Sequence, residues 1–201
     1  METEESKEAV LPADGSALIL VGVQRDYLPG GSMAVSGGDA IVPALNRYLD
    51  LFRQLHLPIF ATRAWRPADH GSFLAQGGKW PPHCVADTTG AEFAPGLDLP
   101  PDVRVISKAT RPHEDAYSGF SGTDLDRQLR GLGVHSLYVG GLATDYCVLM
   151  TVLDALDREF RVYLLQDAVR PLNLHPDDGA RAVQRMEEEG ALLLDFSALA
   201  A

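Results

Sequence analysis

Cys147 is the residue in this sequence whose surroundings are most typical of a reactive side chain. The apolar run at 136–139 predicts a buried strand before it, and apolar residues at helical spacing predict a helix after it. Two glycines and a Thr-Asp pair lie between them, so the chain turns sharply and Thr144 or Asp145 is the expected N-cap. Cys147 then lies in the first helical turn, where free N–H groups and the helix dipole favour a thiolate. A buried structural cysteine is the other interpretation, and these residues leave both open.

Alternating strands and helices position this cysteine. Apolar runs predict strands at 17–21, 58–62, 103–107, 136–139, 161–165 and 191–196, and helical spacing predicts helices at 41–57, 125–132 and 178–189 as well as after Cys147. The alternation predicts one α/β domain over 16–201, with a six-stranded, mostly parallel sheet and helices on both faces, a three-layer, Rossmann-like fold. Ligands bind beyond the carboxyl ends of such strands. We therefore expect one pocket to be formed by residues at strand ends: Gly22, the segment 63–83, Lys108 and Cys147.

Composition limits the function classes. The chain has 201 residues and a formal net charge of −11, which argues against nucleic-acid and anionic-membrane partners. Its two cysteines, Cys84 and Cys147, are far apart, so we expect no disulfide and a reducing, cytoplasmic location. Residues 1–15 are acidic at the start and lack a signal-peptide pattern, so we expect a flexible tail. No apolar run approaches a membrane span.

Several strong motifs are absent from the sequence. No G-x-G-x-x-G follows the first predicted strand and there is no P-loop, so nothing supports dinucleotide or phosphate-cradle binding. There is also no H-E-x-x-H and no paired C-x-x-C, the strongest zinc signatures.

A series of motifs in a fixed order carries a family resemblance. They lie at 21–32, 61–66, 70–73, 80–85, 106–108, 117–120 and around Cys147. Over roughly residues 17–196 the chain resembles the nicotinamidase/pyrazinamidase branch of the isochorismatase-like cysteine hydrolases. The resemblance implies amide hydrolysis through an acyl-enzyme, with ammonia as the leaving group.

The resemblance also assigns roles to residues. It implies that Cys147 is the nucleophile, that Lys108 orients it, and that the N–H groups of Ala143 and Cys147 bind the oxyanion. It implies a cis peptide bond between Leu142 and Ala143. Tyr27 and Trp80 are expected to line an aromatic substrate pocket, with a weaker expectation for Phe73, whereas a place in the core is the alternative for all three.

The sequence departs from the family at the catalytic aspartate. Gly22 occupies that position, and Asp26, four residues further on, is expected to face elsewhere. Lys108 still faces Cys147, and an ammonium beside a thiol favours the thiolate. What is missing is a group that protonates leaving ammonia and activates water, which is typically worth about 10²–10⁴ in rate. We therefore expect very weak nicotinamide hydrolysis or none.

The metal site of the family is also disrupted. Its ligand positions are Ala64, Arg66, His70 and His83 here, and two histidines alone rarely hold a divalent ion. We therefore expect no metal or other cofactor. Arg66 brings a permanent positive charge in place of the cation, and its guanidinium can bind an acceptor or a carboxylate of a small ligand. His83 is counted with Tyr27, Trp80 and Arg66 as a substrate-binding residue, although a remaining structural histidine is the favoured interpretation of it, and His70 has less claim to a role.

Three hypotheses follow. The leading one is a pseudoenzyme that binds a small molecule or a partner through the old pocket. The alternative is an active cysteine hydrolase that acts on a different small amide or an ester, with Arg66 as anion anchor and a water or His83 as base. The third is a protein whose Cys147, beside Lys108, traps electrophiles or oxidants without turnover. The resemblance suggests dimers or larger assemblies, although no residue marks an interface.

Overall fold

Six strands form one sheet in the computed structural model, which describes residues 11–199. Part of the predicted tail, residues 1–10, therefore lies outside the described residues. The sheet order is β3-β2-β1-β4-β5-β6, and all five pairings are parallel, which confirms the predicted fold class. The strands are β1 Ser16–Val21, β2 Ile59–Ala64, β3 Arg104–Lys108, β4 Ser136–Leu142, β5 Arg161–Arg170 and β6 Leu192–Leu194.

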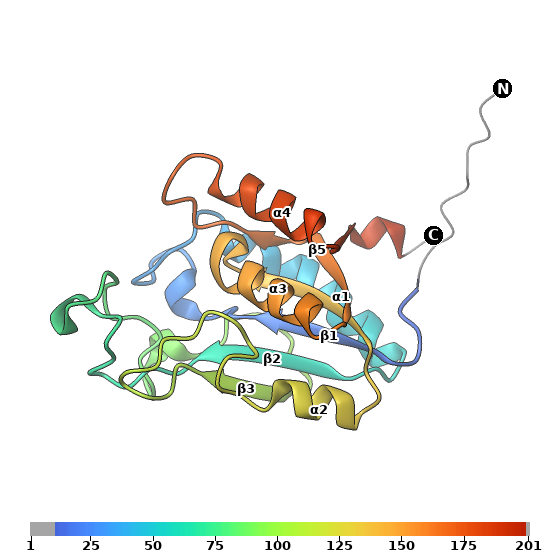
Figure 1. Ribbon diagram of the computed structural model, residues 1–201, viewed down its shortest axis with the longest axis horizontal. Coiled ribbons are helices and arrows are strands. Elements are labelled where there is room, and N and C mark those ends of the chain that lie inside the picture. Colours follow the sequence, from blue (N-terminus) through green and yellow to red (C-terminus); the bar gives the residue numbers. More distant parts are fainter. Residues whose placement is uncertain (1–10, 200–201) are drawn as a thin grey trace.

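Helices cover both faces of the sheet because the central strands are buried on both sides. The helices are α1 Val42–Gln54, α2 Leu125–Gly131, α3 Leu149–Asp157 and α4 Asp178–Glu188. Leu18 and Leu20 of β1 pack in the core beneath α1, whereas Ile19 and Val21 face the core beneath the other three helices. Figure 1 shows α2, α3 and α4 in front of the sheet and α1 behind it. None of these described helices has the length and apolar character needed to cross a bilayer.

The strand order changes direction between β1 and β4. The chain leaves β1 toward β2 on one side and leaves β4 toward β5 on the other. Ligand sites of open parallel sheets lie beyond the carboxyl ends of the strands at such a switch point. The long segment between β2 and β3 projects beyond these same ends, in green at the left of Figure 1, and carries only the one-turn helices η3 Leu74–Gln76 and η4 Thr89–Ala91.

Strand β5 is longer than the sequence pattern predicts. The predicted run ends at 165, but pairing with β4 resumes at Val169 after a register shift. The polar residue Asp167 lies within the irregular part of β5, where its carboxylate accepts a hydrogen bond of 2.7 Å from the Tyr48 hydroxyl on α1. A bulge thus accommodates polar residues that break the apolar pattern.

Candidate functional site

Strand β4 turns into a helix at the point where the sequence predicts the reactive cysteine. The peptide bond between Leu142 and Ala143 is cis, as the family resemblance implies. A π-helical turn, η5 Thr144–Val148, then leads into α3 and contains Cys147.

The expected N-cap, Thr144 or Asp145, is wrong. The cap is Ala143, which has extended backbone and a methyl side chain that accepts no capping hydrogen bond. The Thr144 hydroxyl has no partner among the described residues. Asp145 instead accepts hydrogen bonds of 2.8 Å from the N–H groups of Leu172 and Asn173, so its carboxylate holds the loop after β5.

Lys108 lies directly behind Cys147. It is the last residue of β3 and is 2% exposed, and its Nζ lies 3.4 Å from the Sγ of Cys147. The same Nζ donates a hydrogen bond of 2.9 Å to the Ala116 carbonyl. No carboxylate in the described part of the chain pairs with Lys108, so the sulfur is the only side-chain atom that its ammonium contacts by hydrogen bonding.

The backbone of Gly22 disfavours any side chain at this position, where the resemblance implies the catalytic aspartate. Its φ is +58°, in the left-handed region, and a Cβ at this position would lie 3.0 Å from the Leu142 carbonyl oxygen. Its N–H donates to the Thr62 carbonyl at 3.0 Å. Asp26 does not compensate, because its Oδ2 accepts a hydrogen bond of 2.6 Å from the Cys84 N–H. Asp26 therefore faces away from Cys147, as its position predicts.

Arg66 is the largest fully buried side chain among residues 11–199. It is 1% exposed, and neither Nε nor Nη1 has a hydrogen-bond partner among the described residues. The nearest carboxylate is Asp115, whose Oδ1 lies 3.7 Å from Nη2, beyond hydrogen-bonding distance. Burial disfavours the charge, but the neighbouring Tyr27 phenol and the thiols of Cys147 and Cys84 keep the pKa of Arg66 above its ordinary value.

His83 is neutral and presents only an acceptor to the cavity. Its Nδ1 lies 2.8 Å from the Pro81 carbonyl, which can only accept, so Nδ1 carries the hydrogen and Nε2 keeps a lone pair. Burial and the positive charge of Arg66 lower the pKa of His83 to about 4. His83 therefore adds no positive charge near pH 7.

His70 has no nitrogen free for a metal. Its Nε2 lies 3.2 Å from the Glu114 carbonyl and must donate to it. Its Nδ1 then accepts from the Ser72 N–H at 3.2 Å and from the Ser72 hydroxyl at 2.8 Å. His70 is thus a structural residue that ties two loops together.

The residues at the family's metal position do not fit a divalent ion. Ala64 offers no ligand, Arg66 brings a guanidinium, and the nitrogens of His70 are engaged, which leaves His83 alone. Within residues 11–199 no group of three or more His, Cys, Asp or Glu side chains could hold a metal together.

An aromatic cavity unites these residues. Six of the seven predicted site residues line it, and Lys108 supports it from behind Cys147. The Trp80 indole N–H donates to the Tyr117 hydroxyl at 3.0 Å, and the Trp80 ring meets the Tyr146 ring edge to face. The lining residues are Tyr27, Met33, Val35, Arg66, Trp80, His83, Tyr117, Ala143, Tyr146, Cys147 and Leu172.

Phe73 and Cys84 lie in the core beside the cavity and do not line it. Phe73 does not line the cavity and packs its ring against His70 and His83, so it supports the pocket from outside. Cys84 is fully buried, and burial raises the pKa of its thiol to about 12.

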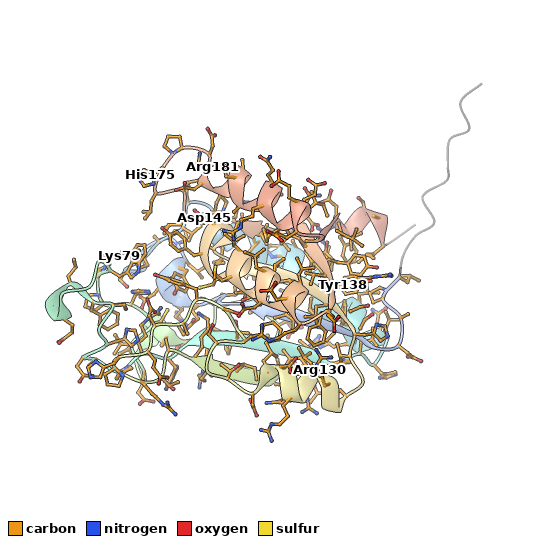
Figure 2. The ribbon with its side chains drawn as sticks, viewed as in Figure 1. Lys79, Arg130, Tyr138, Asp145, His175 and Arg181 are labelled. Carbon is orange, nitrogen blue, oxygen red and sulfur yellow. The ribbon has the colours of Figure 1, made fainter. Side chains whose placement is uncertain are left out.

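Sequence reasoning missed five of the lining residues. Tyr117 begins one of the recognised motifs and Tyr146 precedes Cys147, so position carried a signal for both. Met33, Val35 and Leu172 reach the cavity from loops that show no periodic pattern. Figure 2 shows Lys79 and Asp145 at the end of the molecule where the strands finish, with Tyr138 at the opposite end.

A parallel α/β sheet with a cysteine at its switch point and a lysine behind it defines the class of protein. The sequence matches the isochorismatase domain over residues 16–197, and the chain belongs to this family of hydrolases, in its nicotinamidase branch.

Its relatives include the nicotinamidase of Escherichia coli, 38% identical over 198 residues that cover 88% of this chain and 93% of that protein. The nicotinamidase/pyrazinamidase of Mycobacterium tuberculosis is 40% identical over 159 residues, which cover 75% and 84% of the two chains. A crystal structure of the Pyrococcus horikoshii pyrazinamidase in complex with zinc superimposes with a TM-score of 0.87. It is 49% identical and covers 90% of this chain and 99% of that one.

Proposed function

We propose that this protein binds a small molecule in the cavity beside Cys147 without a metal, and that it hydrolyses nicotinamide very slowly or not at all. One observation carries the proposal: two buried cations, Arg66 and Lys108, adjoin the thiol, and no carboxylate bonds to either within hydrogen-bonding distance in residues 11–199. Arg66 takes the place of a metal ligand, and Gly22 takes the place of the catalytic base.

The missing proton donor is the chemical reason for low amidase activity. The sulfur of Cys147, beside Lys108, can attack an amide carbonyl, but the amide nitrogen leaves as ammonia only after it gains a proton. His83 cannot protonate it near pH 7, because its pKa is about 4 and its Nδ1 hydrogen is bound to Pro81. General acid–base help is worth about 10²–10⁴ in rate, so its loss leaves an amidase close to inactive.

Ester hydrolysis is the second candidate function. The contact of 3.4 Å between Lys108 and Cys147 supports it, since this pair alone can activate the nucleophile. The Ala143 N–H also supports it, because this residue lines the cavity and no described residue accepts its hydrogen. An alkoxide or phenoxide leaves with less protonation than ammonia needs, so the missing acid matters less.

Two assays on the purified protein test these functions. We expect ammonia release from nicotinamide, with added zinc, to match that of the Cys147→Ala variant. Ammonia release that is clearly above this control would overturn the proposal. Hydrolysis of 4-nitrophenyl acetate in excess over Cys147→Ala would establish the ester-cleaving function, and equal rates would exclude it.

A further inference from the structure

We propose that the ligand of the cavity is a flat-ring monocarboxylate whose carboxylate is bound by the guanidinium of Arg66. This inference rests on the proposed function, because it assigns the ligand of the same cavity. It names the chemical class of that ligand.

The incomplete hydrogen bonding of the buried Arg66 side chain indicates that the ligand is an anion. A buried charge without partners is strongly unfavourable, and removal of its hydration is compensated only by hydrogen bonds and an opposite charge. Two of the three guanidinium nitrogens of Arg66 lack a partner among the described residues, although the side chain is 1% exposed. A carboxylate accepts hydrogen bonds from a guanidinium and neutralises it.

No carboxylate of residues 11–199 takes this place. Asp115 is the nearest acid, yet its Oδ1 lies 3.7 Å from Arg66 and accepts a hydrogen bond of 3.0 Å from the Ala116 N–H. The Asp115 side chain is also 35% exposed, so it lies partly in solvent at the rim. Asp115 thus forms a long ion pair with Nη2 and leaves Nε and Nη1 of Arg66 without an acceptor among the described residues, so a bound ligand is the source of one.

The charges around the cavity favour a single carboxylate over a phosphate. Arg66 is the one lining cation, because Lys108 lies behind Cys147 and is engaged there, and His83 is neutral. One guanidinium matches one negative charge, whereas a phosphate dianion would need further donors.

The aromatic walls of the cavity favour a ligand that contains a flat ring. Tyr27, Trp80, Tyr117 and Tyr146 line the narrow cavity, and aromatic side chains make favourable stacked or edge-to-face contacts with another ring. Met33, Val35 and Leu172 complete an apolar lining that excludes a second charged group.

Calorimetric titration with benzoate and benzamide tests the proposal. The two probes have nearly the same size and shape, but only benzoate carries a charge. We expect benzoate to bind about 10- to 100-fold more tightly, which is the range of a charge-assisted hydrogen-bonded pair. We expect Arg66→Met to abolish this preference.

Arg63→Met is the matched control. Arg63 lies three residues earlier and bonds to Ser107 at 2.9 Å, outside the cavity, so this variant should keep the preference for benzoate. Bound benzoate should also slow alkylation of Cys147, which lines the same cavity.

Each result has one meaning. Equal binding of the two probes by the wild-type protein, or no binding of either, would overturn the proposal without any variant. A preference that survives Arg66→Met would overturn it as well. These outcomes are independent of the ammonia assay. Ammonia release from nicotinamide would refute the proposed function whatever the calorimetry shows.

Discussion

The Nζ of Lys108 lies 3.4 Å from the Sγ of Cys147, although the two residues extend from strands that are separated by β1 and β2. The contact joins the end of β3 to the turn after β4 and so spans the switch point of the sheet. No carboxylate of residues 11–199 accompanies it, so the sulfur is the side-chain partner of the ammonium, and the Ala116 carbonyl is its backbone partner.

Alkylation by iodoacetamide at pH 7 should therefore modify Cys147 and depend on Lys108. We expect Lys108→Met to slow the reaction about 10-fold or more, because it removes the ammonium that contacts the Cys147 sulfur at 3.4 Å. Cys84 is the internal control, since its pKa of about 12 keeps it unreactive. Mass spectrometry of peptides distinguishes the two sites. A Cys147 that stays unmodified would argue against a nucleophilic role and against ester hydrolysis.

A side chain at position 22 should destabilise the fold. Gly22→Ala places a Cβ in a left-handed backbone and 3.0 Å from the Leu142 carbonyl. We expect the free energy of unfolding to fall by about 1–2 kcal/mol from the backbone alone, and further from the close contact. Gly37→Ala is the matched control, because Gly37 has φ +65° with no atom near its Cβ position.

Urea unfolding of the two variants separates the two causes. Equal losses would mean that the Leu142 contact costs nothing. A triple variant, Gly22→Asp with Ala64→Asp and Arg66→His, would return to this chain the residue types that the resemblance implies for the catalytic and metal positions. It meets the same obstacle at position 22, so we expect it to regain little nicotinamide hydrolysis. Full recovery of activity would contradict this geometry.

His83 should make the protein sensitive to acid. Its folded pKa of about 4 lies below the ordinary value of 6.5, so between these pH values the unfolded chain binds a proton that the folded chain does not. Stability present above pH 6.5 is therefore lost as the pH falls toward 4. Between pH 7 and pH 4.5 we expect His83 to lower the free energy of unfolding of the wild type by about 2 kcal/mol. The His83→Phe variant should not show this part of the decrease when both proteins are unfolded in urea at the two pH values. Parallel pH profiles would contradict it.

Arg66→Met should raise the pKa of His83. The positive charge of Arg66 is the second cause, after burial, of the lowered value. Its removal favours the protonated imidazole, so the histidine should titrate closer to 6.5. NMR titration of the ring protons in both proteins measures the change. An unchanged pKa would mean that burial alone accounts for the shift.

The same variant should not lose stability. Replacement of an incompletely paired buried ion by an apolar side chain of similar length is often neutral or stabilising by up to about 4 kcal/mol. We expect Arg66→Met to unfold at the same or a higher urea concentration than the wild type. A loss of about 2 kcal/mol or more would show that the guanidinium is satisfied within the protein.

The fold was predictable because local patterns and topology agree. The unbroken apolar run of β1 and the helical spacing of α1 each have one structural solution, and strands alternating with helices imply a parallel sheet. The β5 extension escaped prediction because polar Asp167 interrupts the apolar run inside a strand, where a bulge accommodates it.

The site was predictable in part. The strand-end positions placed Cys147, Lys108 and Arg66 together, since carboxyl ends of parallel strands meet at one edge. The N-cap at Ala143 was not predictable, because Asp145 is recruited by a loop distant in sequence. Leu172 was missed for the same reason, since tertiary packing alone brings that loop to the cavity.

Whether a guanidinium has displaced the metal is measured most directly by titrating zinc into the purified, tag-free protein in a calorimeter. We expect no saturable binding by the wild type, because Arg66 occupies the position and the nitrogens of His70 are engaged. The Ala64→Asp, Arg66→His double variant is the comparison, and it should gain measurable affinity. Stoichiometric, tight zinc binding by the wild type would contradict the replacement of the metal by Arg66.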